Sequence, residues 1–161
     1  MLHITLEAGL PVNGTPRNFD LLKGRRDTGD LTATLIRNPV NIDPQKNFDW
    51  TLTLSVNGGG LIAMKDLWGS GPFKPNDLYP YEAPTSGYQT ITINMPAASK
   101  NWADGFDFRS YYFYDGQHYG RVTISVQPDY PPPMTHASFD AYVNPSGSRN
   151  LEFDETKQIN Q

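Results

Sequence analysis

The chain has 161 residues, a formal net charge of −4 from 13 basic and 17 acidic residues, and no cysteine. The length suits one domain with its own hydrophobic core, and the lack of cysteine excludes a disulfide framework and a thiolate metal site. The basic residues are scattered apart from Lys23, Arg25 and Arg26, which excludes the concentrated basic surface that nucleic-acid binding needs.

The apolar residues are few but large. The hydrophobic fraction of 37% is low and the aromatic fraction of 12% is high, while 14 glycines and 14 prolines interrupt the chain often. This composition is typical of a β-sandwich and not of a helical bundle. No stretch reaches the roughly 20 apolar residues of a membrane-spanning helix. The first ten residues also lack the features of a signal peptide, so we expect any exported form to be the mature part of a longer chain.

Alternation of apolar and polar residues at a period of two predicts strands along the whole chain. The longest alternation runs from Phe48 to Val56. In chain order, strands are predicted at residues 2–7, 31–35, 48–56, 61–67, 91–95, 106–113, 117–127, 137–143 and 149–153. The pattern therefore predicts an all-β fold, an antiparallel β-sandwich of about nine short strands, immunoglobulin-like or jelly-roll-like. We expect a single domain over residues 1–154, followed by a polar tail at 155–161.

The central stretch, Phe106–Gln127, is predicted to be a β-hairpin whose even-numbered residues share one apolar face. A three-residue loop at Tyr114–Gly116 would place Phe108 opposite Val122. In that register Gly116 takes the left-handed position that such a loop requires.

Few patterns in the sequence point to chemistry. Residues 58–63, GGGLIA, match a dinucleotide-binding signature, but no helix is predicted after them, so we interpret them as a hairpin loop. The three histidines lack metal-ligand spacing. Asp43, Asn47 and Asp49 could bind calcium, although turn capping is the simpler interpretation. We therefore expect no cofactor, no resident metal and no catalytic constellation.

One long connection, Asp66–Tyr88, combines rigid aromatic residues with prolines. Loops of this length in compact domains usually serve a function. Its aromatic rings could fold back and plug the open end of the sandwich, or they could form a surface that stacks against a glycan or a protein partner. The candidate binding residues are Trp68, Phe73, Tyr79, Tyr81 and Tyr88.

Two stretches in the C-terminal third, Asp115–Arg121 (DGQHYGR) and Asn144–Glu152 (NPSGSRNLE), resemble phrases of β-rich accessory domains in large bacterial exported or cell-surface proteins. The resemblance implies export, an extracellular or cell-surface location and a larger parent polypeptide, but it transfers no functional residues.

The sequence therefore favours a non-catalytic module with a structural or binding role, in or beside a bacterial exported protein. One alternative is a small carbohydrate-active hydrolase that uses carboxylates such as Asp77 and Glu82. Another is a free-standing cytoplasmic protein.

Overall fold

The computed structural model describes residues 1–39, 41, 43, 45–64, 82–129 and 135–152. Within these residues the chain forms strands and no helix. The strands are β1 (Leu2–Ala8), β2 (Arg17–Asp20), β3 (Arg25–Arg26), β4 (Leu31–Asn38), β5 (Asp49–Val56), β6 (Gly60–Ala63), β7 (Ile91–Met95), β8 (Phe106–Tyr114), β9 (Tyr119–Gln127) and β10 (His136–Asn144).

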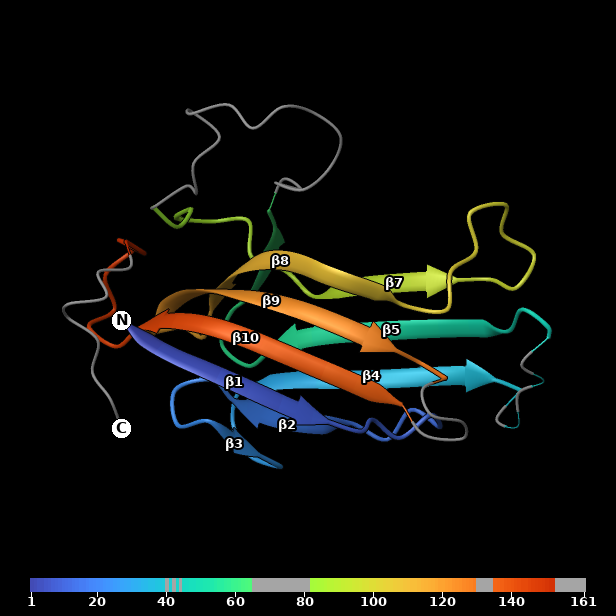
Figure 1. Cartoon of the computed structure of the whole chain (residues 1–161). Coiled ribbons are helices and arrows are strands. Elements are labelled where there is room, and N and C mark those ends of the chain that lie inside the picture. The colour runs from blue at the N-terminus through green and yellow to red at the C-terminus, as the bar shows by residue number, and fades with distance from the viewer. Residues whose placement is uncertain (40, 42, 44, 65–81, 130–134, 153–161) are drawn as a thin grey trace.

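The strands form two five-stranded antiparallel sheets that pack face to face (Figure 1). Sheet A has the strand order β1-β10-β9-β8-β6, and sheet B has the order β3-β2-β4-β5-β7. The predicted antiparallel β-sandwich is confirmed.

The hydrophobic core lies between the two sheets. Side chains along β9 and β10 alternate between buried and half-buried over nine residues each, as expected for strands with one dry face. Phe19 of β2 and Phe139 of β10 meet across this layer, with ring centroids 4.5 Å apart. The sequence pattern does not predict β2, because that strand is short and largely polar, but its buried Phe19 ties sheet B to sheet A.

The strand after the glycine run differs from its prediction. A hairpin loop at residues 58–63 predicts that the strand after it pairs with β5, but β6 pairs with β8 and belongs to sheet A. Because β6 begins at Gly60, the glycines are followed by a strand, and the helix that a dinucleotide site needs is not formed. Residues 65–67 of that prediction lie outside the described part of the chain.

The glycine run is explained by close backbone approach. A Cβ atom at Gly59 would lie 1.9 Å from the carbonyl oxygen of Tyr114, and one at Gly60 would lie 2.4 Å from the backbone nitrogen of Gln89. Gly58 also adopts a positive φ of 77°. Only glycine lets the chain cross between the sheets so close to its neighbours.

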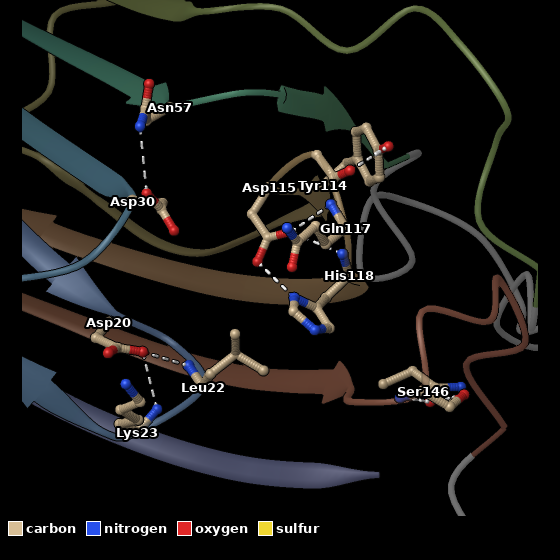
Figure 2. A network of polar contacts seen from close by, with 12 residues as sticks. Asp20, Leu22, Lys23, Asp30, Asn57, Tyr114, Asp115, Gln117, His118 and Ser146 are labelled. Carbon is tan, nitrogen blue, oxygen red and sulfur yellow. Dashed lines mark hydrogen bonds and ion pairs between the residues drawn. The ribbon is translucent and has the colours of Figure 1, made fainter.

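The predicted register of the β8–β9 hairpin is wrong. Tyr111, and not Phe108, lies opposite Val122, and the last pair before the turn is Tyr114 with Tyr119. Gly116 has the expected positive φ, 95°, but the connection spans four residues, 115–118. It is closed by Asp115, whose Oδ1 accepts hydrogen bonds from two backbone N–H groups, those of residues 117 and 118, at 2.8 and 2.7 Å (Figure 2).

A bulge in β8 explains why the even-numbered residues of this strand do not all share one apolar face, although the sequence predicts that they do. Phe106 pairs with Val126 and Arg109 with Ile124, so residues 107 and 108 together oppose the single Ser125. The extra residue shifts the alternation, so Phe106 before the bulge still packs against the core, while after it Tyr111 and Phe113 face the core in place of Tyr112 and Tyr114. Tyr112 and Tyr114 consequently lie on the outer face of sheet A.

The strand predicted at residues 149–153 is not formed in the part of the chain that the structure describes. Asn150 instead makes a single bridge with Glu82, and Leu151 is buried under this contact. Residue 153 lies outside the described part of the chain. The segments 82–89 and 144–152 are thus brought together beside sheet A, although they are far apart in the sequence.

We expect Gly59→Ala to lower the free energy of unfolding by about 3 kcal/mol, because the new methyl group meets backbone that cannot rotate away. Urea unfolding followed by tryptophan fluorescence measures the change. Gln117→Ala, an exposed substitution in the facing turn, serves as the control and should stay within about 0.5 kcal/mol of the original chain. Equal losses for the two variants would show that the glycine contact does not hold the sheets together.

Candidate binding surface

The structure describes one of the five predicted binding residues. Trp68, Phe73, Tyr79 and Tyr81 lie outside the described residues, as does the candidate acid Asp77. Tyr88 and Glu82 are described, and both lie in the segment 82–89 beside the outer face of sheet A. The site is therefore built from Tyr88 outwards.

Tyr88 belongs to a group of aromatic rings that we call the tyrosine cluster. The centroid of the Tyr88 ring lies 5.4 Å from that of Tyr114 and 6.1 Å from that of Tyr119. The rings of Tyr114 and Tyr119 are stacked, with centroids 4.4 Å apart. Three of these rings are partly exposed, while that of the fourth member, Tyr112, is buried. The cluster consists of Tyr88, Tyr112, Tyr114 and Tyr119.

Backbone pairing places each ring. Tyr114 and Tyr119 form the last pair of the β8–β9 hairpin, so their side chains leave the same face next to one another. Tyr88 is brought beside them because the next residue, Gln89, exchanges two backbone hydrogen bonds with Leu61 of β6. Tyr114 and Tyr119 are therefore carried by paired strands, while Tyr88 lies in an irregular segment that a single bridge at Gln89 fixes to β6.

The hydroxyl groups of two rings are also fixed. The Tyr88 hydroxyl donates to the carbonyl oxygen of Pro84 at 3.0 Å, and the Tyr114 hydroxyl donates to that of Gly116 at 2.8 Å. These bonds hold the ring orientations before any ligand arrives, which lowers the entropy lost on binding.

Three of the four tyrosines also belong to a small hydrophobic core on the outer side of sheet A, separate from the main core between the sheets. It covers part of the outer face of sheet A with residues from the segments 82–89 and 144–152. Its members are Ala83, Tyr112 and Leu151, with Met1, Ile62, Met64, Tyr88 and Tyr119 packed against them. The packing gives the tyrosine cluster a structural role, and any binding role is in addition to it.

A polar hollow of about 460 Å³ lies in the same segments. The described residues that line it are Glu82, Ser148, Arg149, Asn150 and Glu152. Arg149 bridges the two segments, because its guanidinium donates to the carbonyl oxygen of Ala83 at 2.9 Å and forms an ion pair with Glu82. A series of side chain–backbone hydrogen bonds from residue 144 to residue 152 holds the lining in place.

The hollow and the tyrosine cluster adjoin. Burial raises the pKa of Tyr88, and the neighbouring hydroxyls of Tyr119 and Tyr112 raise it further, while the positive charge of Arg149 opposes the shift. Arg149 thus acts electrostatically on a ring of the cluster. Ala83 and Leu151, chain neighbours of residues that line the hollow, also pack with Tyr88 and Tyr119 of the cluster.

The aromatic surface extends across sheet A towards its opposite edge. Tyr142 of β10 stacks on His3 of β1, with centroids 4.4 Å apart and planes 7° from parallel. The guanidinium carbon of Arg121 lies 4.7 Å from the Tyr142 ring centroid, and Arg121 pairs with Tyr112 of the cluster. His3 is itself held by Asp140, with Nε2 and Oδ1 2.6 Å apart.

Sequence reasoning missed Tyr112, Tyr114 and Tyr119 as residues of the outer face of sheet A. The period-two pattern placed the first two on the core face, and only the bulge at residues 107–108 moves them outwards. The signal that could have found them is the hairpin turn itself, since an aromatic pair flanking Asp115–His118 lies at the exposed end of a sheet.

The calcium candidates make other contacts. Asp43 accepts the backbone N–H of Gln45 at 3.0 Å, and Asp49 accepts that of Ala97 at 2.6 Å. Asn47 donates to the carbonyl oxygen of Ala97 at 3.3 Å. In the described part of the chain, no three histidine, aspartate or glutamate side chains converge as they would around a metal ion.

The chain matches no family model, and no curated protein or solved structure is significantly similar to it. Among the described residues, no helix is long and apolar enough to cross a membrane. Any functional conclusion must therefore come from the chemistry of the surface itself.

Alkaline pH should destabilise the fold through its buried tyrosines. Burial raises the pKa of Tyr88, Tyr111 and Tyr112 above the ordinary value of 10.0, so the folded state keeps their protons where the unfolded chain has lost them. Their contribution to stability is complete below that value and falls as the pH rises above it. Urea unfolding between about pH 8 and 11 should show the decline, and tyrosinate absorbance should rise later in the folded protein than in urea. Coincident tyrosinate titrations would contradict this prediction.

Proposed function

We propose that the chain is a non-catalytic β-sandwich module that binds carbohydrate on the outer face of sheet A. The observation that carries this proposal is the partly exposed, stacked pair Tyr114–Tyr119 beside the polar hollow around Arg149. A sugar ring has an apolar face of C–H groups and a rim of hydroxyls. Fixed aromatic rings bind the face, and guanidinium, amide and carboxylate groups bind the rim.

The structural role of the tyrosine cluster explains only part of it. Tyr112 is buried and contributes to packing under the segments 82–89 and 144–152. Tyr114 and Tyr119 remain partly exposed, although they are large aromatic residues at the end of a hairpin where a polar pair would suffice. Their stacking provides a rigid platform at small entropic cost, which is a property that a binding surface needs.

The proposed location is extracellular or on the cell surface, in or beside a bacterial exported protein. Its support is the resemblance of the stretches 115–121 and 144–152 to accessory domains of such proteins. The first stretch contains the turn that presents Tyr119, and the second lines the hollow. The two resembling stretches thus border the proposed binding surface.

The hydrolase alternative is weaker. Asp77 lies outside the described residues, and the carboxylate of Glu82 is engaged by the guanidinium of Arg149. Glu152 lines the same hollow, but a glycosidase needs a second carboxyl group that can donate a proton, and the Glu82 carboxylate is ion-paired with Arg149. We therefore propose binding without turnover.

Affinity electrophoresis in gels containing soluble polysaccharides tests the proposal. The native protein should be retarded by at least one neutral polysaccharide, and Tyr114→Ala and Tyr119→Ala should each weaken binding about tenfold, equivalent to about 1.4 kcal/mol. Ile36→Ala is the matched control, because Ile36 is a 52% exposed hydrophobic residue on the outer face of sheet B. Its retardation should match that of the native chain.

Two results would contradict the proposal. Absence of retardation across a panel of plant, fungal and bacterial polysaccharides would favour a protein partner or a purely structural role. Release of reducing sugar from a retained polysaccharide would show that the chain is an enzyme.

A further inference from the structure

Phe108 is the most exposed large hydrophobic side chain of the described residues. Its exposed fraction is 68%, and its φ of +54° places it in the left-handed region. An aromatic residue is uncommon there, because its Cβ crowds the backbone in this conformation. Its backbone N–H donates to the Ser125 hydroxyl at 2.9 Å, so the conformation is held by the neighbouring strand.

The bulge sets the face on which Phe108 lies. Residues 107 and 108 together oppose Ser125, whose neighbours Ile124 and Val126 face the core. Phe108 therefore lies on the outer face of sheet A, the face that carries the tyrosine cluster. A glycine or asparagine would form the bulge with less strain and without an exposed ring, so the bulge alone does not account for phenylalanine.

The strip of outer face between Phe108 and Tyr119 is polar along β9. Ser110 of β8 and Thr123 of β9 lie side by side, with their hydroxyl oxygens 2.9 Å apart, and Arg121 follows towards the cluster. Ser125, which accepts the hydrogen bond from Phe108, and Tyr119 are six residues apart on β9, a span of roughly 20 Å at about 3.3 Å per residue. An aromatic residue thus stands at each end of a strip of hydroxyl groups too long for one sugar ring.

We propose that the binding surface takes a linear glycan of several sugar units that runs along β9, with Phe108 as the stacking residue for its far end. This inference rests on the carbohydrate-binding function proposed above, and it specifies the substrate class. The tyrosine cluster binds one end of the chain, the hydroxyls of Ser110, Thr123 and Ser125 bind sugar hydroxyls along it, and Phe108 binds the last ring.

Isothermal titration calorimetry with linear β-1,4-linked oligosaccharides tests the inference. Cello-, xylo- and manno-oligosaccharides from disaccharide to octasaccharide are the probes. The affinity of the native protein should rise with chain length until the chain spans from the tyrosine cluster to Phe108, and then stay constant. Phe108→Gly should weaken binding of the longest chains about tenfold and leave the affinity for the short ones unchanged.

The choice of Phe108→Gly separates binding from folding. Glycine accepts a positive φ without strain, so the melting temperature of this variant should equal or exceed that of the native chain. Tyr119→Ala is the contrasting variant, and it should weaken binding of short and long chains alike.

The outcomes distinguish this inference from the proposed function. Binding of short and long chains with equal affinity, or no effect of Phe108→Gly on the long ones, would overturn the inference and leave the tyrosine cluster as a site for a single sugar unit. Absence of binding to every length, together with no retardation by any polysaccharide, would overturn both.

Discussion

The close approach of three glycines to two other segments is the constraint on which the tyrosine cluster depends. A side chain at Gly59 would collide with the carbonyl of Tyr114, and one at Gly60 would collide with the backbone between Tyr88 and Gln89. Because neither position carries a side chain, β6 can lie between the hairpin that bears Tyr114 and the segment that bears Tyr88. The crossing from sheet B to sheet A and the assembly of the tyrosine cluster therefore have the same physical cause.

The sequence predicts correctly those strands in which the position of a residue along its own strand decides whether its side chain is buried. The alternation along β5, β9 and β10 is unbroken, because each of these strands has neighbours on both sides in its sheet and one face on the core. The partner of β6 could not be predicted in this way. It depends on a backbone contact with a turn more than 50 residues away along the chain, and period-two patterns carry no information about such contacts.

The tyrosine cluster was predictable only in part for a related reason. The aromatic loop read from the sequence ends at Tyr88, which lies in the cluster, but its binding role stays a prediction. Tyr112 and Tyr114 were assigned to the core, because the uninterrupted pattern of even-numbered aromatic residues hides the bulge. A bulge requires no glycine or proline of its own, and Asp107–Phe108 shows no sequence signature of one. One extra residue thus exchanges the inner and outer faces of the rest of the strand.

The two outer faces of the sandwich have different chemistry, and the difference supports assigning binding to sheet A. The outer face of sheet B is rich in threonines, including Thr34, Thr51 and Thr53, which favour strands and remain hydrated. Thr51 there makes a cross-strand hydrogen bond with Asn94 at 2.8 Å. This face needs no partner to be stable.

The outer face of sheet A is different in kind, because it exposes aromatic rings that are already held in place. His3, Tyr142 and Arg121 form one stacked row across three strands, and Tyr114 stacks on Tyr119 at the hairpin end. Stacking between side chains removes rotational freedom during folding, so a ligand that binds later does not have to remove it again. Phe108 has a strained backbone and an exposed ring, so among the described residues of this face it lowers stability without packing against the core. A ligand that covered the ring would bury its apolar surface, and that is the physical reason for placing the far end of the proposed glycan there.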